Sequence, residues 1–144
     1  MTFRRFGAPL AAAGALAGLA LLAGCQEAPP LPTPQAQSMQ RMLADVQTLR
    51  AYVHNQASPA VAATAADELV SWADRIGMLF PPETAAQYVD MTPDIARLAP
   101  PVLRETATDL ALAVHADSPA ATAPRLARLE HDGCGVCHRN GWKE

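Results

Sequence analysis

Two cysteines and a histidine near the carboxyl end of the chain have the types and spacing of a covalent cofactor site. Two residues separate Cys134 from Cys137, and His138 follows directly, which is the C-x-x-C-H pattern of c-type haem attachment. If this segment is helical, the two thiols lie about one turn apart on one face, where both can form thioethers with the vinyl groups on one edge of a haem. The imidazole of His138 is then close enough to ligate the iron. The motif predicts one covalently attached haem c.

Two other chemistries are open to the same residues. His131, Cys134, Cys137 and His138 could supply two thiolates and two imidazoles to zinc. Adjacent turns of one helix rarely surround a tetrahedral ion, however, and the distant second ligand pair of zinc modules is missing. A redox-active dithiol is the other alternative, but no βαβ pattern surrounds the motif. Haem attachment is therefore favoured over both.

Composition narrows the fold and the function. The 144 residues are 50% hydrophobic but only 5% aromatic, and alanine and leucine dominate, which favours helix. No run of alternating β-branched residues predicts a sheet. The net charge of -3 argues against nucleic acid as a partner. No nucleophile with a base, carboxylate pair at a defined spacing or phosphate-binding loop stands out, so an enzyme is not predicted.

The amino-terminal residues have the pattern of an export signal. Arg4 and Arg5 precede an uncharged run over residues 6–22, which small residues follow. A basic start, an apolar middle and a small-residue end are typical of a secretory signal peptide. We therefore expect residues 1–24 to be removed, with an uncleaved membrane anchor or an ordinary signal peptide without lipidation as the alternatives.

The end of this signal predicts lipidation. Residues 22–25 read Leu-Ala-Gly-Cys and resemble the bacterial lipobox, in which the signal is cut before a cysteine that is then acylated. Several acyl chains on Cys25 would attach the protein to a membrane durably. In lipoproteins the next residue influences sorting, and Gln26 favours the outer membrane. With Cys25 assigned to lipid and the other two cysteines to haem, no structural disulfide is required.

The remainder divides into a tether and a domain. Four prolines in residues 25–34 prevent a regular helix and favour a stiff, extended segment. From residue 35 to residue 144 the apolar pattern is helical. We expect a signal peptide over 1–24, a lipidated cysteine and tether over 25–34, and one folded domain over 35–144.

A first helix is predicted from about residue 35 to residue 55 or 56. Its apolar residues recur at spacings of three and four and are expected to face inward: Met39, Met42, Leu43, Val46, Leu49 and Val53. Its polar residues are expected to face elsewhere: Gln40, Arg41, Asp45 and Gln47. The first helix therefore presents two methionines to the interior near its start.

Proline and serine mark the second helix. The pair Ser58-Pro59 predicts its start, because serine caps free amides and proline is tolerated at the first helical position. The pair Pro81-Pro82 ends it just after Phe80. One face carries its inward residues: Ala62, Ala65, Ala66, Leu69, Trp72, Ala73, Ile76 and Leu79.

Further prolines divide the rest of the chain. The pair Thr92-Pro93 predicts the start of a short helical turn, which Pro100 and Pro101 interrupt. A third helix is therefore expected over about 101–116. Ser118-Pro119 is another cap signal, although Pro124 favours a regular fourth helix only from about Thr122. This helix directs Leu126, Leu129 and Gly133 inward and carries the haem motif. The chain is therefore predicted to be all-α, an antiparallel four-helix bundle with covalent haem on its last helix.

This arrangement resembles the class II cytochromes c, the cytochrome c prime family. Its members are exported four-helix bundles with C-x-x-C-H on the last helix, whereas class I cytochromes c carry the motif near their start. Residues 35–142 match this plan, and Leu79-Phe80-Pro81 matches a recurrent close of the second helix. Members of the family commonly have an aromatic and then a basic residue three and four positions after the haem histidine. The chain departs from this pattern, because Trp142 and Lys143 stand four and five positions after His138.

The resemblance implies that the first helix supplies the distal side of the haem. Met39 and Met42 both fall near its start on the inward face, and counting back from the helix end as in relatives favours Met39 as an iron ligand beside His138. A methionine ligand gives six-coordinate iron and a raised reduction potential, which suits electron transfer. Members of the family often have an arginine four residues before the distal position, and neither Met39 nor Met42 is preceded by one. Both methionines could instead be core residues.

The sequence thus predicts a lipid-anchored, monohaem c-type cytochrome facing the periplasm that transfers single electrons between redox partner proteins. Relatives often form homodimers, so a homodimer is consistent with the resemblance. One alternative is a five-coordinate haem protein that binds small gases such as NO or CO. The other is an envelope interaction protein whose haem is structural.

Overall fold

The computed structural model describes residues 33–83 and 92–141, and every regular element in these two ranges is helical. The elements are α1 (Pro34–Val53), α2 (Pro59–Leu79), α4 (Pro93–His115), α5 (Pro119–Arg128), the π-helix η1 (Leu129–Cys134) and α6 (Gly135–Gly141). The last three follow one another without a break. None of the described helices is long and apolar enough to cross a membrane. The predictions for the signal peptide, for Cys25 and for most of the tether lie outside the described residues.

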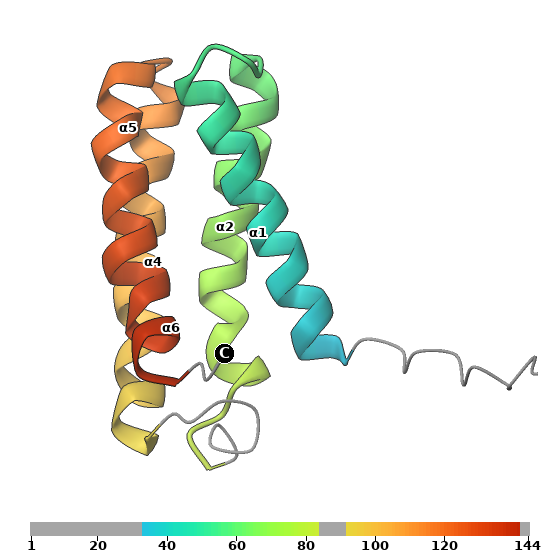
Figure 1. Ribbon diagram of the computed structural model, residues 1–144, viewed down its shortest axis with the longest axis vertical. Helices are drawn as coiled ribbons and strands as arrows, with labels where there is room; N and C mark the ends of the chain where they lie inside the picture. Colours follow the sequence, from blue (N-terminus) through green and yellow to red (C-terminus); the bar gives the residue numbers. More distant parts are fainter. Residues whose placement is uncertain (1–32, 84–91, 142–144) are drawn as a thin grey trace, which may run out of the picture. The chain divides into compact units, whose positions relative to one another are not determined.

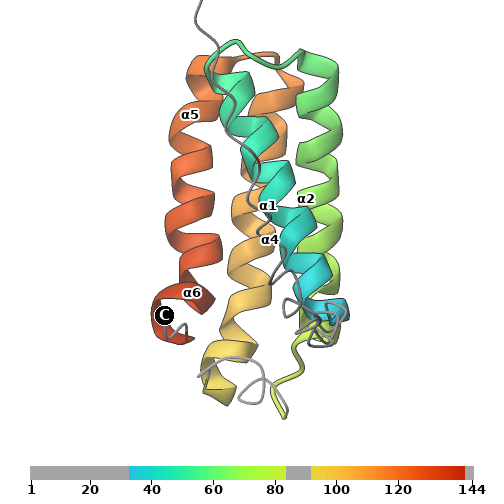
Figure 2. The same cartoon turned by 45° about the vertical axis from the view of Figure 1, so that its right-hand side comes forward.

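The helices pack into a bundle, as the sequence predicts. α1 packs on α2 and α5, and α4 packs on α2, α5, η1 and α6. Figures 1 and 2 show the α1–α2 turn and the α4–α5 turn at the same end of the bundle. The largest fully buried side chains come from α1, α2, α4 and the continuous segment of α5, η1 and α6: Leu49, Leu69, Leu110 and Leu129. One apolar core therefore joins the helices along their length.

Each long helix begins with the same local device. Thr33, Ser58, Thr92 and Ser118 stand before the four helices, each is followed by a proline, and each hydroxyl accepts a hydrogen bond from the amide three residues on. The hydroxyl satisfies an amide that has no partner within the helix, and the proline has no amide to satisfy. The helix starts predicted at Ser58-Pro59 and Ser118-Pro119 are confirmed.

Two of the helices end in the same kind of turn. Asn55 and Asp117 adopt positive φ angles of 59° and 49° after α1 and α4. The amides of Gln56 and Ser118 then reach back to the carbonyls of Ala51 and Ala113. This is the Schellman arrangement, in which a left-handed residue lets the last carbonyls find donors. α1 ends at Val53, two to three residues before the predicted end.

The predicted interruptions by proline are wrong. α4 runs from Pro93 through Pro100 and Pro101 instead of starting near residue 101, and α5 contains Pro124 instead of starting near Thr122. Each internal proline removes one helical hydrogen bond, a local cost of roughly 3 kcal/mol. In α4, burial of Ala96, Ala99 and Leu103 on both sides of the prolines offsets that loss. Tertiary packing overrides the local preference there.

Two expectations about α1 are also wrong. Leu43, expected inside, is 52% exposed, and Asp45, expected to face elsewhere, is only 9% exposed. Leu43 lies at the edge of the apolar stripe of α1. The neighbouring helices α2 and α5 cover only the middle of this stripe, so Leu43 remains exposed. The remaining inward residues of α1 and α2 are buried or partly buried.

Candidate functional site

A cavity lies at the end of the bundle opposite the two short turns. The start of α1, the end of α2 and the first half of α4 line it, and the segment carrying the cysteines closes it. The space between atoms is about 570 Å³, part of it open to solvent. Its walls include Ile76, Phe80, Ala96 and Leu103, so the surface offered to a ligand is largely apolar.

All five residues that the sequence singles out for haem line this one cavity. Met39 and Met42 lie on the α1 wall, and Cys134, Cys137 and His138 lie on the opposite segment, almost one hundred residues later. Met42 is 8% exposed and belongs to the core, whereas Met39 is partly buried and packs against the edge of the core. Both cysteines are partly buried free thiols.

The helix that carries the cysteines changes its winding just before them. Residues Leu129–Cys134 form a π-helix, in which each turn holds an extra residue, between the α-helical α5 and α6. Leu129 and Gly133 remain buried in this turn, and Cys134 still reaches the cavity. The extra residue changes the register of everything that follows relative to a regular helix. Sequence periodicity predicts a plain helix here, and the glycines on either side of Cys134 are the only local signal of a departure.

Gly133 allows this turn to approach α4 closely. A Cβ at this position would lie 2.5 Å from Thr106 Oγ1 and 3.1 to 3.2 Å from side-chain atoms of Leu129 and Leu103. The Thr106 hydroxyl donates to the carbonyls of Val102 and Leu103, so it is fixed in this contact. Only glycine fits the space between η1 and α4.

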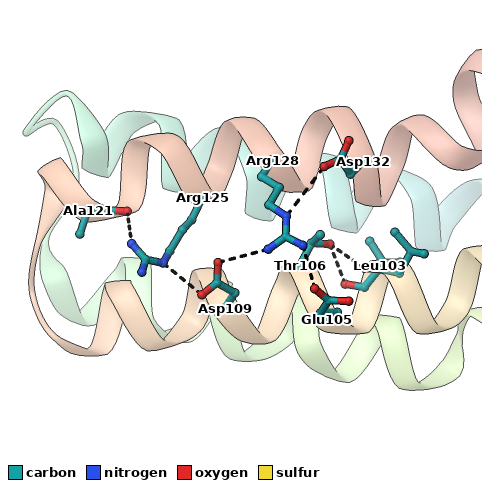
Figure 3. Close-up of polar contacts among 9 residues, drawn as sticks. Leu103, Glu105, Thr106, Asp109, Ala121, Arg125, Arg128 and Asp132 are labelled. Carbon is teal, nitrogen blue, oxygen red and sulfur yellow. Dashed lines mark hydrogen bonds and ion pairs between the residues drawn. The ribbon is translucent and has the colours of Figure 1, made fainter.

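Ion pairs hold the same segment from outside. Figure 3 shows Arg128 within reach of Glu105 (2.7 Å), Asp109 (3.8 Å) and Asp132 (3.8 Å), while Arg125 pairs with Asp109 at 3.2 Å. These side chains are substantially exposed, so each pair contributes little to stability. Their joint effect is orientation, because they connect α5 and η1 to α4.

A further ion pair connects the segment to α1. Arg50 Nε lies 2.8 Å from Glu130 Oε1, four residues before Cys134. The guanidinium of Arg139 lies against Gly135, where a Cβ would be 2.9 Å from Arg139 Cζ. The motif is therefore flanked by charged side chains, although the cavity behind it is apolar.

The titratable groups of the motif are in their neutral forms. Burial raises the pKa of the Cys134 thiol to about 11, with the charge of Glu130 adding to the effect, and burial also raises the pKa of Cys137. His138 stands at the exposed rim of the cavity, yet the apolar surroundings lower its pKa. At neutral pH the site therefore presents two protonated thiols and a neutral imidazole, the form of histidine that binds metals.

This donor set fits a haem better than a metal ion alone. Two thiols one turn apart, an adjacent neutral imidazole and apolar walls suit a large, flat, mostly apolar group attached along one edge. In the described ranges no three or more His, Cys, Asp or Glu residues are grouped to hold a metal ion. His131, which the zinc alternative needs, is exposed and pairs with Asp132 at 2.7 Å.

Comparisons of this chain with protein-family models, with curated proteins and with solved structures find no match. The assignment of a function therefore depends on the residues of this chain and their geometry. Trp142 and Lys143, at which the sequence departs from the family pattern, lie outside the described residues.

Proposed function

We propose that this protein is a monohaem c-type cytochrome that transfers single electrons on the periplasmic side of a bacterial membrane. The observation that carries the proposal is the shared cavity: one apolar space is lined by both cysteines, by the following histidine and by two methionine side chains. The resemblance to class II cytochromes c in motif, motif position and helical bundle supports it.

Each residue of the cavity has a task in this proposal. Cys134 and Cys137 would hold the haem covalently, and His138 would ligate the iron. Met39, on the facing wall, is the proposed second ligand, because it is less tightly packed than Met42 and can direct its sulfur into the cavity. The apolar walls exclude water from the bound group. The haem supplies the one-electron chemistry.

Lipid on Cys25 would keep the domain at the membrane, where it exchanges electrons with partner proteins. Replacement of Cys25 by serine, in a chain whose residues 1–24 are exchanged for a signal peptide that is cleaved without lipidation, is expected to release the protein from the membrane fraction without altering its absorption spectrum. Retention in the membrane fraction would contradict the lipid anchor and leave the haem proposal standing.

The test of electron transfer is reversible reduction of the protein, purified after export from a host with c-type haem maturation. We expect a low-spin spectrum with a sulfur-to-iron charge-transfer band and a single one-electron wave. Met39→Leu is expected to abolish the band and lower the reduction potential, while the matched Met42→Leu variant retains both. A wild-type spectrum that is high-spin and shifts on adding carbon monoxide would favour gas binding over electron transfer.

A further inference from the structure

Asp45 is a buried carboxylate that the haem site does not use. It lies on the inner side of α1 with 9% of its surface exposed, and its Oδ2 has no hydrogen-bond donor among the described residues. An ionised carboxylate in such a place is costly unless a donor or a positive charge offsets the burial. The surroundings of Asp45 therefore decide its charge.

The groups from α2 that meet Asp45 are an acid and an indole. The exposed Glu68 raises the pKa of Asp45 through its negative charge, and the Trp72 indole acts in the opposite direction. Arg75 of α2 stacks over the Trp72 ring at 4.1 Å and donates to the backbone carbonyl of Ser71. The other acids of this helix, Asp67 and Asp74, form ion pairs with α4. α2 thus offers a second carboxylate and no compensating charge.

Among the described residues, no cation of α1 or α5 forms an ion pair with Asp45. Arg41, one turn away on α1, is exposed, and Arg50 pairs with Glu130 of η1. α5, the second helix packed on α1, carries Arg125 and Arg128, and both bind carboxylates of α4. The negative charge of the exposed Glu68 therefore disfavours the ionised form of the buried Asp45 carboxyl.

Burial, followed by the charge of Glu68 and the hydrogen bond with it, raises the pKa of Asp45 from 3.8 to about 6. Below that pH the Asp45 carboxyl is protonated and neutral, so its burial costs less. Above it Asp45 carries a negative charge inside the bundle.

Asp45 lies in the layer directly behind the cavity. It is one helical turn beyond Met42, and Trp72 is one turn beyond Ile76, and both Met42 and Ile76 line the cavity. Asp45 is buried and only one turn from the cavity wall, so a change of charge in the cavity acts on it.

We propose that Asp45 is a proton-binding site whose affinity for the proton depends on the charge of the group in the cavity. The coupling rests on the proposed function, whereas the proton site does not. When a reduced partner protein delivers an electron to the cavity, the added negative charge favours uptake of one proton from solvent by Asp45. On oxidation the proton returns to solvent, so charge is balanced in both directions.

The proton site is tested on the purified protein by following the Trp72 indole N–H resonance with pH. The sequence contains two tryptophans, and a Trp142→Phe variant assigns the two indole signals. We expect the Trp72 signal to titrate with a midpoint near pH 6 in the wild type. Asp45→Asn should remove the titration, Glu68→Gln should move it to lower pH, and the matched surface variant Asp74→Asn should leave it unchanged.

A midpoint near 4 in the wild type, or a titration that persists in Asp45→Asn, would overturn the proton site. The coupling is tested by the reduction potential, which should fall as pH rises through the same window in the wild type and stay level in Asp45→Asn. A level potential in a wild type that shows the indole titration would overturn the coupling alone. A protein that carries no haem would defeat the proposed function, and the indole titration would still decide the proton site.

Discussion

The two ends of the bundle are built differently. At the turn end, α1 and α4 finish in Schellman turns, and the Tyr52 hydroxyl donates to Asp117 Oδ1 at 2.9 Å. Asp67 of α2 pairs there with His115 at 2.8 Å, and Leu49 and Leu110 lie fully buried beneath. At the other end the helices surround a cavity, and the cysteine segment has an irregular π-helical turn. The turn end holds the helices together so that the cavity end can stay open for a ligand.

Truncation of the packed core should have the largest effect on stability. Leu110 is fully buried toward the turn end, and Leu110→Ala is expected to lower the free energy of unfolding by about 2 to 5 kcal/mol. The control is Leu43→Ala, at an exposed position that the sequence pattern places inside, and its effect should stay within about 0.5 kcal/mol. Denaturant unfolding of both variants measures the difference. Equal losses would contradict the described orientation of α1.

A methyl group at Gly133 should have the next largest effect. The added carbon would meet Thr106 at 2.5 Å, so Gly133→Ala is expected to cost about 1 to 3 kcal/mol and to disturb the cysteine segment. At Gly77 of α2 the nearest atom would be Pro100 Cγ at 3.6 Å, an ordinary contact. Gly77→Ala should therefore stabilise the protein by up to about 1 kcal/mol, because alanine favours helix. Opposite signs for the two variants are the predicted result, and a stabilising Gly133→Ala would contradict the close packing of η1 on α4.

Loss of a single hydrogen bond at the turn end should have a smaller effect. Tyr52 is 2% exposed, and Tyr52→Phe keeps the ring but removes the donor to Asp117. We expect a loss of about 1 kcal/mol in the free energy of unfolding. Asp117→Asn retains an acceptor and tolerates the positive φ angle, so it should lose less. An unchanged stability of Tyr52→Phe would show that this contact does not hold the turn end.

The smallest effect is expected for the ion pair between α1 and η1. Arg50 and Glu130 are 54% and 33% exposed, so the double-mutant cycle of Arg50→Gln and Glu130→Gln should give about 0 to 1 kcal/mol of coupling at low salt. High salt should reduce this energy because exposed charges are screened. A coupling energy that survives molar salt would mean that the pair is more shielded from water than the geometry indicates.

Features of the fold that depend on local residues could be predicted from the sequence, whereas features that depend on packing between helices could not. Helix starts at Ser58 and Ser118 are local, since the hydroxyl and the proline act within one turn, and the structure confirms them. The buried faces of α2 follow from spacing alone. The passage of α4 through Pro100 and Pro101 depends on packing from other helices, which no local signal encodes.

At the site, motif spacing predicted the two cysteines and the histidine, the order of the helices predicted the two methionines, and all five residues line one cavity. The π-helical turn and the contact of Gly133 with Thr106 depend on how closely two helices approach, so periodicity could not reveal them. The burial of Asp45 was missed for the same reason, since a polar residue within an apolar helix is normally placed outside.

The most direct test of the account is whether haem stays on the polypeptide after the exported protein is denatured. The intact mass and the absorption spectrum of the unfolded chain should show one haem per chain in the wild type. Replacing both Cys134 and Cys137 by alanine should leave the denatured chain without haem. A correctly exported, folded wild-type protein that carries no haem would contradict the central claim.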